Sequence, residues 1–395
     1  MRIVFVSANA VLDPSSGAAI SIRTLLRLLA QAGASTRSLT ASIYDRAPSK
    51  SNAENMRAAG AAPTDPAAPL AELWSASDSS VLHEIIPVAK SGRLLQTRAD
   101  ERRMVGFATK MIEEFRPDVI LTYGGGYFER EVVSIAQERG IVTAFYLAHP
   151  GYQNASTFNN IDQVFTDTKT TRDLYVERLK INPYAIGKFI DQPTIDPTET
   201  RRFVTFVNPS AEKGVTLFYR IAELAAQTSP ELQFQVVESR ATLQSAEERA
   251  GMRFSALPNI HRVGLQRDMG QVFSRTKVML QPSLWHESGA RASIEAMSLG
   301  IPIVATDRGG IPEVLGDGAI LITPPEQLVV NHTLIPPLTV AVPWVDVLTS
   351  LFQDEQMYAH HSERALNGWK AHEPTGRIRA ILELLEGLVA AKQAW

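Results

Sequence analysis

The chain has 395 residues, of which 45% are hydrophobic and 21% are charged. This length exceeds what one compact core usually holds, so we expect two domains, and the composition excludes wholesale disorder and fibrous repeats. The 39 Lys and Arg residues against 42 Asp and Glu residues give a formal charge of −3, which argues against nucleic-acid binding. The absence of cysteine excludes disulfides, thiolate catalysis and Cys-based zinc sites.

The apolar runs of the sequence fall short of the ~20 residues that cross a bilayer, so we expect no transmembrane segment. A peripheral contact with a membrane stays open. At the start of the chain, Arg2 is followed directly by Ile3–Val6, which is typical of a first strand and not of a signal peptide. We therefore expect a cytoplasmic protein, which suits a chain without cysteine.

Short apolar runs alternate with amphipathic stretches through the first half of the chain. Arg2–Ala8 has the pattern of a buried strand, and Ile20–Gln31 has apolar residues at helical spacing. The further strands expected here are Thr36–Ser42, Val81–Ile86, Val119–Tyr123, Val142–Leu147 and Gln163–Thr166. The helices expected between them are Arg98–Phe115, Glu129–Arg139 and Thr170–Leu179. We expect Ala47–Ser80, rich in Ala, Pro, Ser and Asp, to be a long excursion with at most one short helix.

The alternation breaks at Ile186–Arg202 and then restarts. The strands expected in the second half are Phe203–Val207, Phe234–Val237, Ile260–Val263, Val278–Gln281, Ile303–Thr306 and Ala319–Ile322. Helices are expected over Val215–Ala225 and Thr375–Ala391. Continuously apolar strands separated by helices predict parallel sheets covered on both faces, which is the α/β class. We predict two doubly wound domains, 1–190 and 191–374, and a C-terminal helix over 375–395 that crosses back onto the first. Two such domains facing each other would bind a ligand in the cleft between them.

The segment Leu280–Glu313 carries the most informative motif. A strand is expected to end at Gln281, and a helix is expected to begin around Glu287–Ser288. Glu287 and Glu295 would then lie roughly 12 Å apart along the helix axis. That span fits one carboxylate at a sugar ring and another at the ribose of the same nucleotide sugar. The helix N-terminus between them would offer N–H groups to a diphosphate.

The order of these features resembles the nucleotide-sugar site of glycosyltransferase family 4. The shared features are the strand, Pro-Ser, Glu287, seven residues, Glu295 with Ala-Met, then Gly-Ile-Pro, a second strand, and Gly-Gly-Ile-Pro-Glu. The resemblance covers nearly the whole chain. It implies the GT-B fold, in which two Rossmann-like domains face each other across the active site. It also implies a retaining, metal-independent hexosyltransferase that uses a nucleotide diphosphate sugar, expected to be a UDP-sugar, and an acceptor that the sequence does not identify.

The resemblance also implies roles for individual residues. Glu287 is expected to contact the transferred sugar, Glu295 the ribose hydroxyls, Lys213 the leaving diphosphate, and His149 the donor sugar. Residues expected to bind the donor or its nucleotide besides Lys213 and Glu295 are Gly17, Ala18, Asn208, Leu265, Gly289, Ala290 and Arg291.

Two of these donor-site positions depart from the family. Asn208 replaces an arginine of the family, and Arg291 replaces an apolar residue. Arg291 is expected either to pair with phosphate or to point to solvent.

Two alternatives stay open at this point. The two departures would fit a non-catalytic subunit that binds a nucleotide sugar, and a sugar-nucleotide epimerase can share the GT-B architecture. No Asp-x-Asp motif occurs in the sequence. We therefore expect no metal ion and no cofactor besides the co-substrate.

Overall fold

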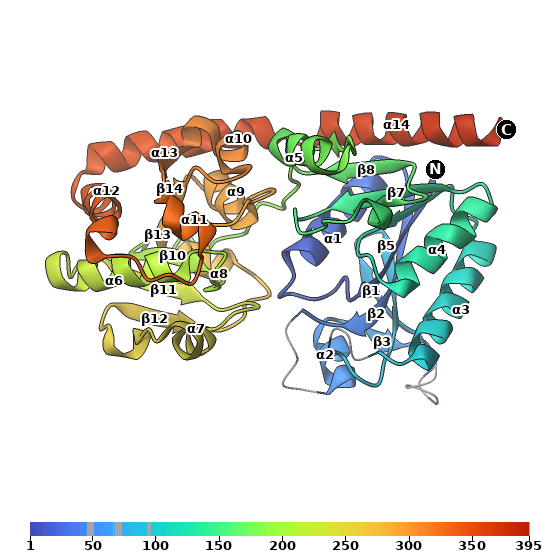
Figure 1. Cartoon of the computed structure of the whole chain (residues 1–395), viewed down its shortest axis with the longest axis horizontal. Coiled ribbons are helices and arrows are strands. Elements are labelled where there is room, and N and C mark those ends of the chain that lie inside the picture. Colours follow the sequence, from blue (N-terminus) through green and yellow to red (C-terminus); the bar gives the residue numbers. More distant parts are fainter. Residues whose placement is uncertain (46–50, 66, 68–72, 93–95, 395) are drawn as a thin grey trace. The chain divides into compact units, whose positions relative to one another are not determined.

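The chain folds into two compact α/β units, each described here by itself (Figure 1). Unit 1 comprises Met1–Phe189 and Pro374–Trp395, and unit 2 comprises Ile190–Glu373. The structure, a computed structural model, describes residues 1–45, 51–65, 67, 73–92 and 96–394. Within these residues, no helix is both long and apolar enough to span a membrane.

Unit 1 is built on a nine-stranded sheet in the order β3-β4-β5-β2-β1-β6-β7-β8-β9. The strands are β1 (Arg2–Asn9), β2 (Ser35–Ile43), β3 (Ala62–Pro63), β4 (Trp74–Asp78), β5 (Val81–Ile86), β6 (Val119–Thr122), β7 (Val142–Leu147), β8 (Gln163–Thr166) and β9 (Tyr184–Ala185). The helices are α1 (Gly17–Gln31), α2 (Asn52–Ala58), α3 (Arg98–Phe115), α4 (Tyr127–Glu138), α5 (Lys169–Leu179) and α14 (Thr375–Gln393). All neighbouring strands pair in parallel except β4, which is antiparallel to both β3 and β5.

The central strand β1 is apolar at successive positions because both faces of the sheet are covered. Ile3 and Phe5 belong to one buried cluster, and Val4 and Val6 belong to another. Successive side chains of a strand point to opposite faces, so an uninterrupted apolar run fits a strand with helices on both sides.

The prediction for Ala47–Ser80 is wrong in part. Residues 47–50, 66 and 68–72 lie outside the described residues, and the short helix α2 is present. The segment also contributes strand β4, whose Trp74 is completely buried and pairs opposite Ile85 of β5. Strand β4 forms an antiparallel hairpin with β5, since Asp78 pairs with Val81 across the turn, and the composition of Ala47–Ser80 does not reveal this pairing.

Helix α14 completes the core of unit 1, although it comes from the other end of the chain. Its residues Ile378, Ile381 and Leu385 are buried in the same cluster as Ile3 and Phe5. Burial of each such side chain stabilises the fold by about 1.5–3 kcal/mol. Close to the end of the helix, Lys392 Nζ donates to Asp162 Oδ2 at 2.6 Å. Burial alone would raise the pKa of Asp162, but hydrogen bonds from Lys392 and neighbouring groups lower it overall.

Unit 2 is built on a six-stranded parallel sheet in the order β12-β11-β10-β13-β14-β15. The strands are β10 (Phe203–Val207), β11 (Gln233–Val237), β12 (Ile260–Val263), β13 (Thr276–Gln281), β14 (Ile303–Thr306) and β15 (Ala319–Ile322). The helices are α6 (Val215–Thr228), α7 (Leu243–Ala250), α8 (Gly270–Ser274), α9 (Arg291–Ser298), α10 (Ile311–Leu315), α11 (Glu326–Val330), α12 (Val342–Gln353) and α13 (Glu355–Trp369). Its strands also contribute alternate side chains to two buried clusters, as Met279 and Leu280 of β13 show.

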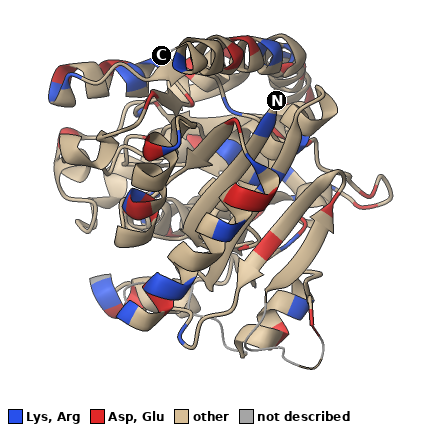
Figure 2. Ribbon diagram, turned by 90° about the vertical axis from the view of Figure 1, so that its right-hand side faces the viewer, with Lys and Arg blue, Asp and Glu red and all other residues tan. Residues whose placement is uncertain are grey.

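Charged residues of both signs are interspersed over the elements drawn in Figure 2. Blue and red segments alternate along the ribbons seen from this side, and neither colour gathers into one large region. This arrangement accords with the nearly balanced composition of 39 basic and 42 acidic residues.

Candidate active site

Two loops of unit 2, one following β10 and one following β13, are joined by hydrogen bonds. Strands β10 and β13 are adjacent in the sheet, and both loops leave their carboxyl ends. The backbone N–H groups of Leu284 and Trp285 both donate to the carbonyl oxygen of Glu212, at 2.9 and 3.0 Å. Gly214 has a φ of +79°, and a Cβ atom at this position would lie 1.8 Å from the carbonyl oxygen of Pro282. The close approach of the loops therefore requires glycine beside Lys213.

Lys213 and Glu287 meet across these two loops. Lys213 Nζ lies 2.5 Å from Glu287 Oε1, and Ser283 Oγ donates to the same oxygen at 2.5 Å. Glu287 is buried. Burial raises the pKa of the Glu287 carboxyl, but Lys213, Ser283 and the positive charge of Arg240 together hold this pKa below its ordinary value. The site thus combines an ammonium group with a buried carboxylate that is ionised at neutral pH.

The prediction that a helix begins around Glu287 is wrong. Helix α9 begins at Arg291, and Glu287 lies in the preceding loop. Ala290, the residue before α9, has a φ of +39°, so the backbone changes direction there. The estimate of roughly 12 Å between the two glutamates assumed a continuous helix, and it does not apply.

The loop at Gly309-Gly310 packs on Glu287. Gly310 N–H donates to the Glu287 carbonyl oxygen at 2.7 Å, and a Cβ atom on Gly309 would lie 2.6 Å from the Glu287 nitrogen. Glu287 is therefore held in place through its backbone as well as its side chain.

Arg291 and Glu295 form a second ion pair in unit 2. They stand one turn apart on α9, with Arg291 Nε 2.8 Å from Glu295 Oε1, and both side chains are largely buried. Arg291 thus pairs with Glu295 instead of pointing to solvent, and its contact with phosphate stays a prediction. The carboxylate predicted to bind ribose already holds an arginine of the same helix.

The other predicted nucleotide-binding residues of unit 2 lie in loops. Asn208 directly follows β10 with a left-handed φ of +62°, and its Oδ1 accepts the Ala241 N–H at 3.0 Å. Leu265 follows β12 and is exposed. Gly289 and Ala290 directly precede α9. All four thus lie on the side of the sheet where the parallel strands end, which is where ligands of such sheets bind.

In unit 1, His149 follows strand β7 and is exposed. Its ring stacks on that of Tyr152 with centroids 4.9 Å apart, and its Nδ1 accepts the Gly151 N–H at 3.1 Å. A neutral His149 therefore carries its proton on Nε2. Tyr152 OH also accepts the Gly124 N–H at 3.1 Å, so it joins the loops that follow β6 and β7.

Gly17 and Ala18 begin helix α1, which follows β1. The Ser16 side chain caps this helix by accepting the Ala19 N–H. Beyond its own helix backbone and chain neighbours, a Cβ atom on Gly17 would meet no atom within 4 Å among the residues of unit 1 that the structure describes. Packing of these residues therefore does not require glycine at position 17.

Sequence reasoning assigned neither Ser283 and Arg240 to the site in unit 2 nor Tyr152 to the loops beside His149 in unit 1. Ser283 belongs to the Pro-Ser pair of the motif, so its proximity to Glu287 had a signal in the sequence. Tyr152 and Arg240 lie in irregular loops, and only the fold shows which loops lie side by side.

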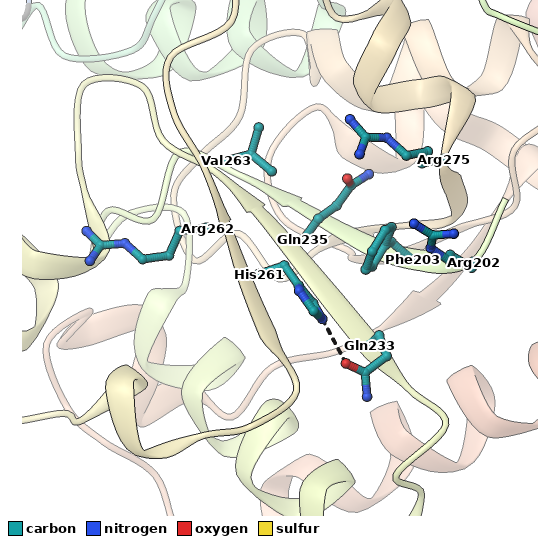
Figure 3. Close-up of a pocket in the computed structure, with 8 residues that line it drawn as sticks. All are labelled: Arg202, Phe203, Gln233, Gln235, His261, Arg262, Val263 and Arg275. Atoms are coloured by element: carbon teal, nitrogen blue, oxygen red, sulfur yellow. Dashed lines mark hydrogen bonds between the residues drawn. The ribbon is translucent and has the colours of Figure 1, made fainter. Parts of the chain in front are cut away.

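A pocket of about 450 Å³ lies elsewhere in unit 2, beside the first residues of β10 and β11 and along β12 (Figure 3). It is lined by Arg202, Phe203, Gln233, Gln235, His261, Arg262, Val263 and Arg275. Several of its polar groups have partners in the chain: His261 bonds Gln233, and Arg262 pairs with Glu238. None of the predicted site residues lines it, so we assign it no part in the chemistry.

The structure shows no cluster of three or more His, Cys, Asp or Glu side chains that could hold a metal ion among the residues it describes. The predicted site residues of unit 2 instead form two cation–carboxylate pairs, Lys213 with Glu287 and Arg291 with Glu295. Such pairs can bind anions and hydroxyl groups directly.

The fold of the chain is the GT-B fold of glycosyltransferases. The structure of sucrose-phosphate synthase from Thermosynechococcus elongatus is similar to that of this chain, with a TM-score of 0.67 and 16% sequence identity. The alignment covers 99% of this chain and 100% of the synthase chain. HepE from Anabaena in complex with UDP-glucose is 14% identical with a TM-score of 0.69, and 98% of this chain covers 100% of that one. At these identities the likeness establishes the fold.

Part of unit 2 is similar to a known family. Residues 201–334 match the family described as Glycosyl transferases group 1. A human protein, one of the subunits of phosphatidylinositol N-acetylglucosaminyltransferase, is 27% identical over 166 residues, which are 40% of this chain and 34% of that protein. The match thus spans about a third of the length of that curated relative.

Proposed function

We propose that this protein is a retaining glycosyltransferase of family 4 that transfers a hexose from a nucleoside diphosphate sugar. The observation that carries the proposal is the Lys213–Glu287 pair in loops at the carboxyl ends of adjacent parallel strands. The match of residues 201–334 to Glycosyl transferases group 1 supports the reaction class. HepE, which shares the fold, was solved with UDP-glucose, and this supports UDP as the first nucleotide to test.

The two charged groups suit the two charges that develop when the sugar departs. As the bond from the sugar C1 to the diphosphate oxygen breaks, Lys213 neutralises the negative charge on the leaving group. The carboxylate of Glu287 stabilises the positive charge on the sugar ring. Because Lys213 and Ser283 both bond Oε1, we assign the contact with the sugar to Oε2. In the proposed retaining step the acceptor oxygen attacks from the face that the diphosphate leaves, and the departing phosphate accepts its proton.

Acceptor recognition is assigned to unit 1. In the same unit, His149 is a candidate contact to the donor sugar, and the loop at Gly17 and Ala18 is a candidate contact to the donor. The proposed location is the cytoplasm, because a chain without cysteine suits a reducing compartment. The acceptor itself is unidentified.

A binding subunit without activity is the second candidate, because the Arg291–Glu295 pair occupies the carboxylate expected to bind ribose. Slow hydrolysis of a UDP-hexose panel by the purified protein, with release of UDP, separates the two functions. A binding subunit would bind the donor and leave it intact.

Replacement of Glu295 by Ala should weaken the binding of UDP and of uridine equally. Glu295 is proposed to accept hydrogen bonds from the ribose diol, and loss of bonds to a charged group costs roughly 1.5–3 kcal/mol. Calorimetric titration of UDP and uridine measures both affinities, and Glu326→Gln at an exposed position serves as the control. Arg291→Leu removes the partner of Glu295 and should leave the uridine affinity equal to or above that of the wild type. Unchanged uridine binding by Glu295→Ala would place the ribose elsewhere.

Sugar transfer should proceed equally well with and without EDTA. The proposal assigns charge neutralisation of the diphosphate to Lys213 and to backbone N–H groups, so it requires no divalent cation. The release of UDP from the donor, measured after exhaustive treatment with EDTA, tests this expectation. Abolition of UDP release by the chelator and its recovery with Mn²⁺ would show that a metal ion supplies the charge.

A further inference from the structure

The loop that follows strand β11 joins the two loops of the candidate active site. Asn208 Oδ1 accepts the Ala241 N–H at 3.0 Å, and the Asn208 N–H donates to the Val237 carbonyl oxygen at 2.8 Å. The Asn208 side chain therefore fixes the turn at residues 239–241 against the loop that carries Lys213. Because β10 lies between β11 and β13 in the sheet, these loops leave three neighbouring strands.

The turn at residues 239–241 is anchored on both sides. Ser239 N–H donates to the Ala241 carbonyl oxygen at 3.2 Å. On one side of the turn, Glu238 Oε1 accepts the Leu243 N–H at 3.0 Å. Glu238 N–H donates to the Val263 carbonyl oxygen at 2.8 Å. Arg240, in the middle of this turn, is exposed and is carried on a constrained backbone.

The charge of Arg240 acts on the candidate site. It lowers the pKa of Glu287. Its effect is smaller than that of burial, which raises this pKa, and smaller than those of Lys213 and Ser283, which lower it. It also contributes to a lowered pKa of Glu212, whose carbonyl oxygen joins the two loops. Electrostatic effects on two carboxylates from the loops after β10 and β13 agree with the hydrogen bonds in placing Arg240 beside this site.

The two ion pairs of the site add no net positive charge to balance a bound diphosphate. Lys213 with Glu287, and Arg291 with Glu295, are each neutral as a pair. A diphosphate brings at least two negative charges, so its binding gains from a cation that is added to these pairs.

We propose that Arg240 is a diphosphate-binding residue, which supplies from the β11 loop the positive charge that Asn208 cannot supply from the β10 loop. This inference rests on the proposed function, since it assigns a further donor contact to the same site. Arg240 would contact the oxygens of the diphosphate and would leave the nucleoside untouched. The contribution of an arginine in this place is therefore specific to ligands that carry phosphate groups.

The test compares UDP with uridine by calorimetry for the full-length wild type, Arg240→Gln, Arg240→Lys and the control Arg253→Gln, another exposed arginine of unit 2. Arg240→Gln should weaken UDP binding by roughly 10- to 100-fold, as expected for loss of a charge-assisted contact, and leave uridine binding within twofold. Arg240→Lys should recover part of the UDP affinity, and Arg253→Gln should match the wild type. Melting temperatures should agree among all four proteins.

Three other outcomes would contradict the proposal, and they can be told apart. UDP binding within twofold of the wild type in Arg240→Gln, while Lys213→Ala loses it, would overturn the role of Arg240 and leave the proposed function standing. Equal loss of UDP and uridine binding in Arg240→Gln would show that Arg240 acts by holding the loop, which also overturns the proposal. Failure of the wild type to bind UDP, GDP or ADP would overturn the proposed function and this inference with it.

Discussion

Glu287→Gln should lower the rate of sugar transfer by roughly 10²–10³-fold, the usual effect of removing one group that stabilises charge in a transition state. Glutamine keeps the size of the side chain and its contact with Ser283, but it cannot balance a positive charge on the sugar. Lys213 loses its ionic partner at the same time, so the affinity for UDP should stay equal to that of the wild type or rise. Steady-state rates with the preferred donor, and calorimetry with UDP, measure the two effects.

The pH dependence of turnover gives an independent test of Glu287. Its pKa lies below the ordinary value, so the ionised form persists from neutral pH down to below the ordinary pKa of glutamate. The ion pair with Lys213 contributes fully to stability at pH values above the ordinary pKa of glutamate. This contribution is lost as the pH falls through the lowered pKa of Glu287. Titration of Glu287 should therefore not reduce turnover near pH 6. An acid limb at that pH that disappears in Glu287→Gln would contradict this expectation.

The binding of UDP checks where Glu287 acts. Equal loss of UDP binding in Glu287→Gln and Glu295→Ala would show that Glu287 contacts the nucleotide rather than the sugar.

Lys188→Met should destabilise the protein by about 3–5 kcal/mol, because it leaves a buried charge without its partner. Lys188 Nζ lies 2.7 Å from Asp167 Oδ2 and 3.1 Å from Tyr146 OH, and both charged side chains are almost fully buried. Tyr146 OH also donates to Asp167 Oδ1 at 2.5 Å. Urea-induced unfolding followed by circular dichroism measures the loss.

A second variant separates the unpaired charge from a general packing defect in unit 1. Lys188→Met combined with Asp167→Asn removes both charges, so it should recover a large part of the lost stability. The control Lys169→Met lies at the start of α5, beyond the end of β8, at an exposed position. A loss below about 1 kcal/mol in Lys188→Met would show that water reaches Asp167 and solvates it.

The α/β class could be predicted from the sequence because the evidence for it is local, and the GT-B fold followed from the resemblance of the Glu287–Glu295 motif to family 4. Ile303–Ala305 is continuously apolar, and such short runs between helical patterns indicate buried parallel strands. The comparisons confirm the GT-B fold. Strand β4 was missed because its pairing with β5 and the burial of Trp74 depend on contacts that composition does not report.

The site residues show a similar division between local and distant causes. The spacing of Arg291 and Glu295 already permits an i, i+4 ion pair, and the structure contains that pair. The place of Glu287 in a loop depends on Gly309 and Gly310, which pack on its backbone from more than 20 residues away. The proximity of Lys213 and Glu287 likewise depends on the contact of Gly214 with Pro282, which no pattern of spacing reveals.

The way in which α14 completes unit 1 has a consequence for synthesis on the ribosome. Ile378, Ile381 and Leu385 fill a core whose other residues come from the first part of the chain. All of unit 2 is translated before these residues, which takes on the order of 10–40 s at about 5–20 residues per second. During that interval the first part of the chain leaves exposed the apolar residues that α14 later covers. Unit 2 can finish folding before unit 1 does. These exposed residues are therefore a surface for chaperones to cover, and destabilising substitutions in α14 should reduce the yield of folded protein in cells more than their effect on equilibrium stability predicts.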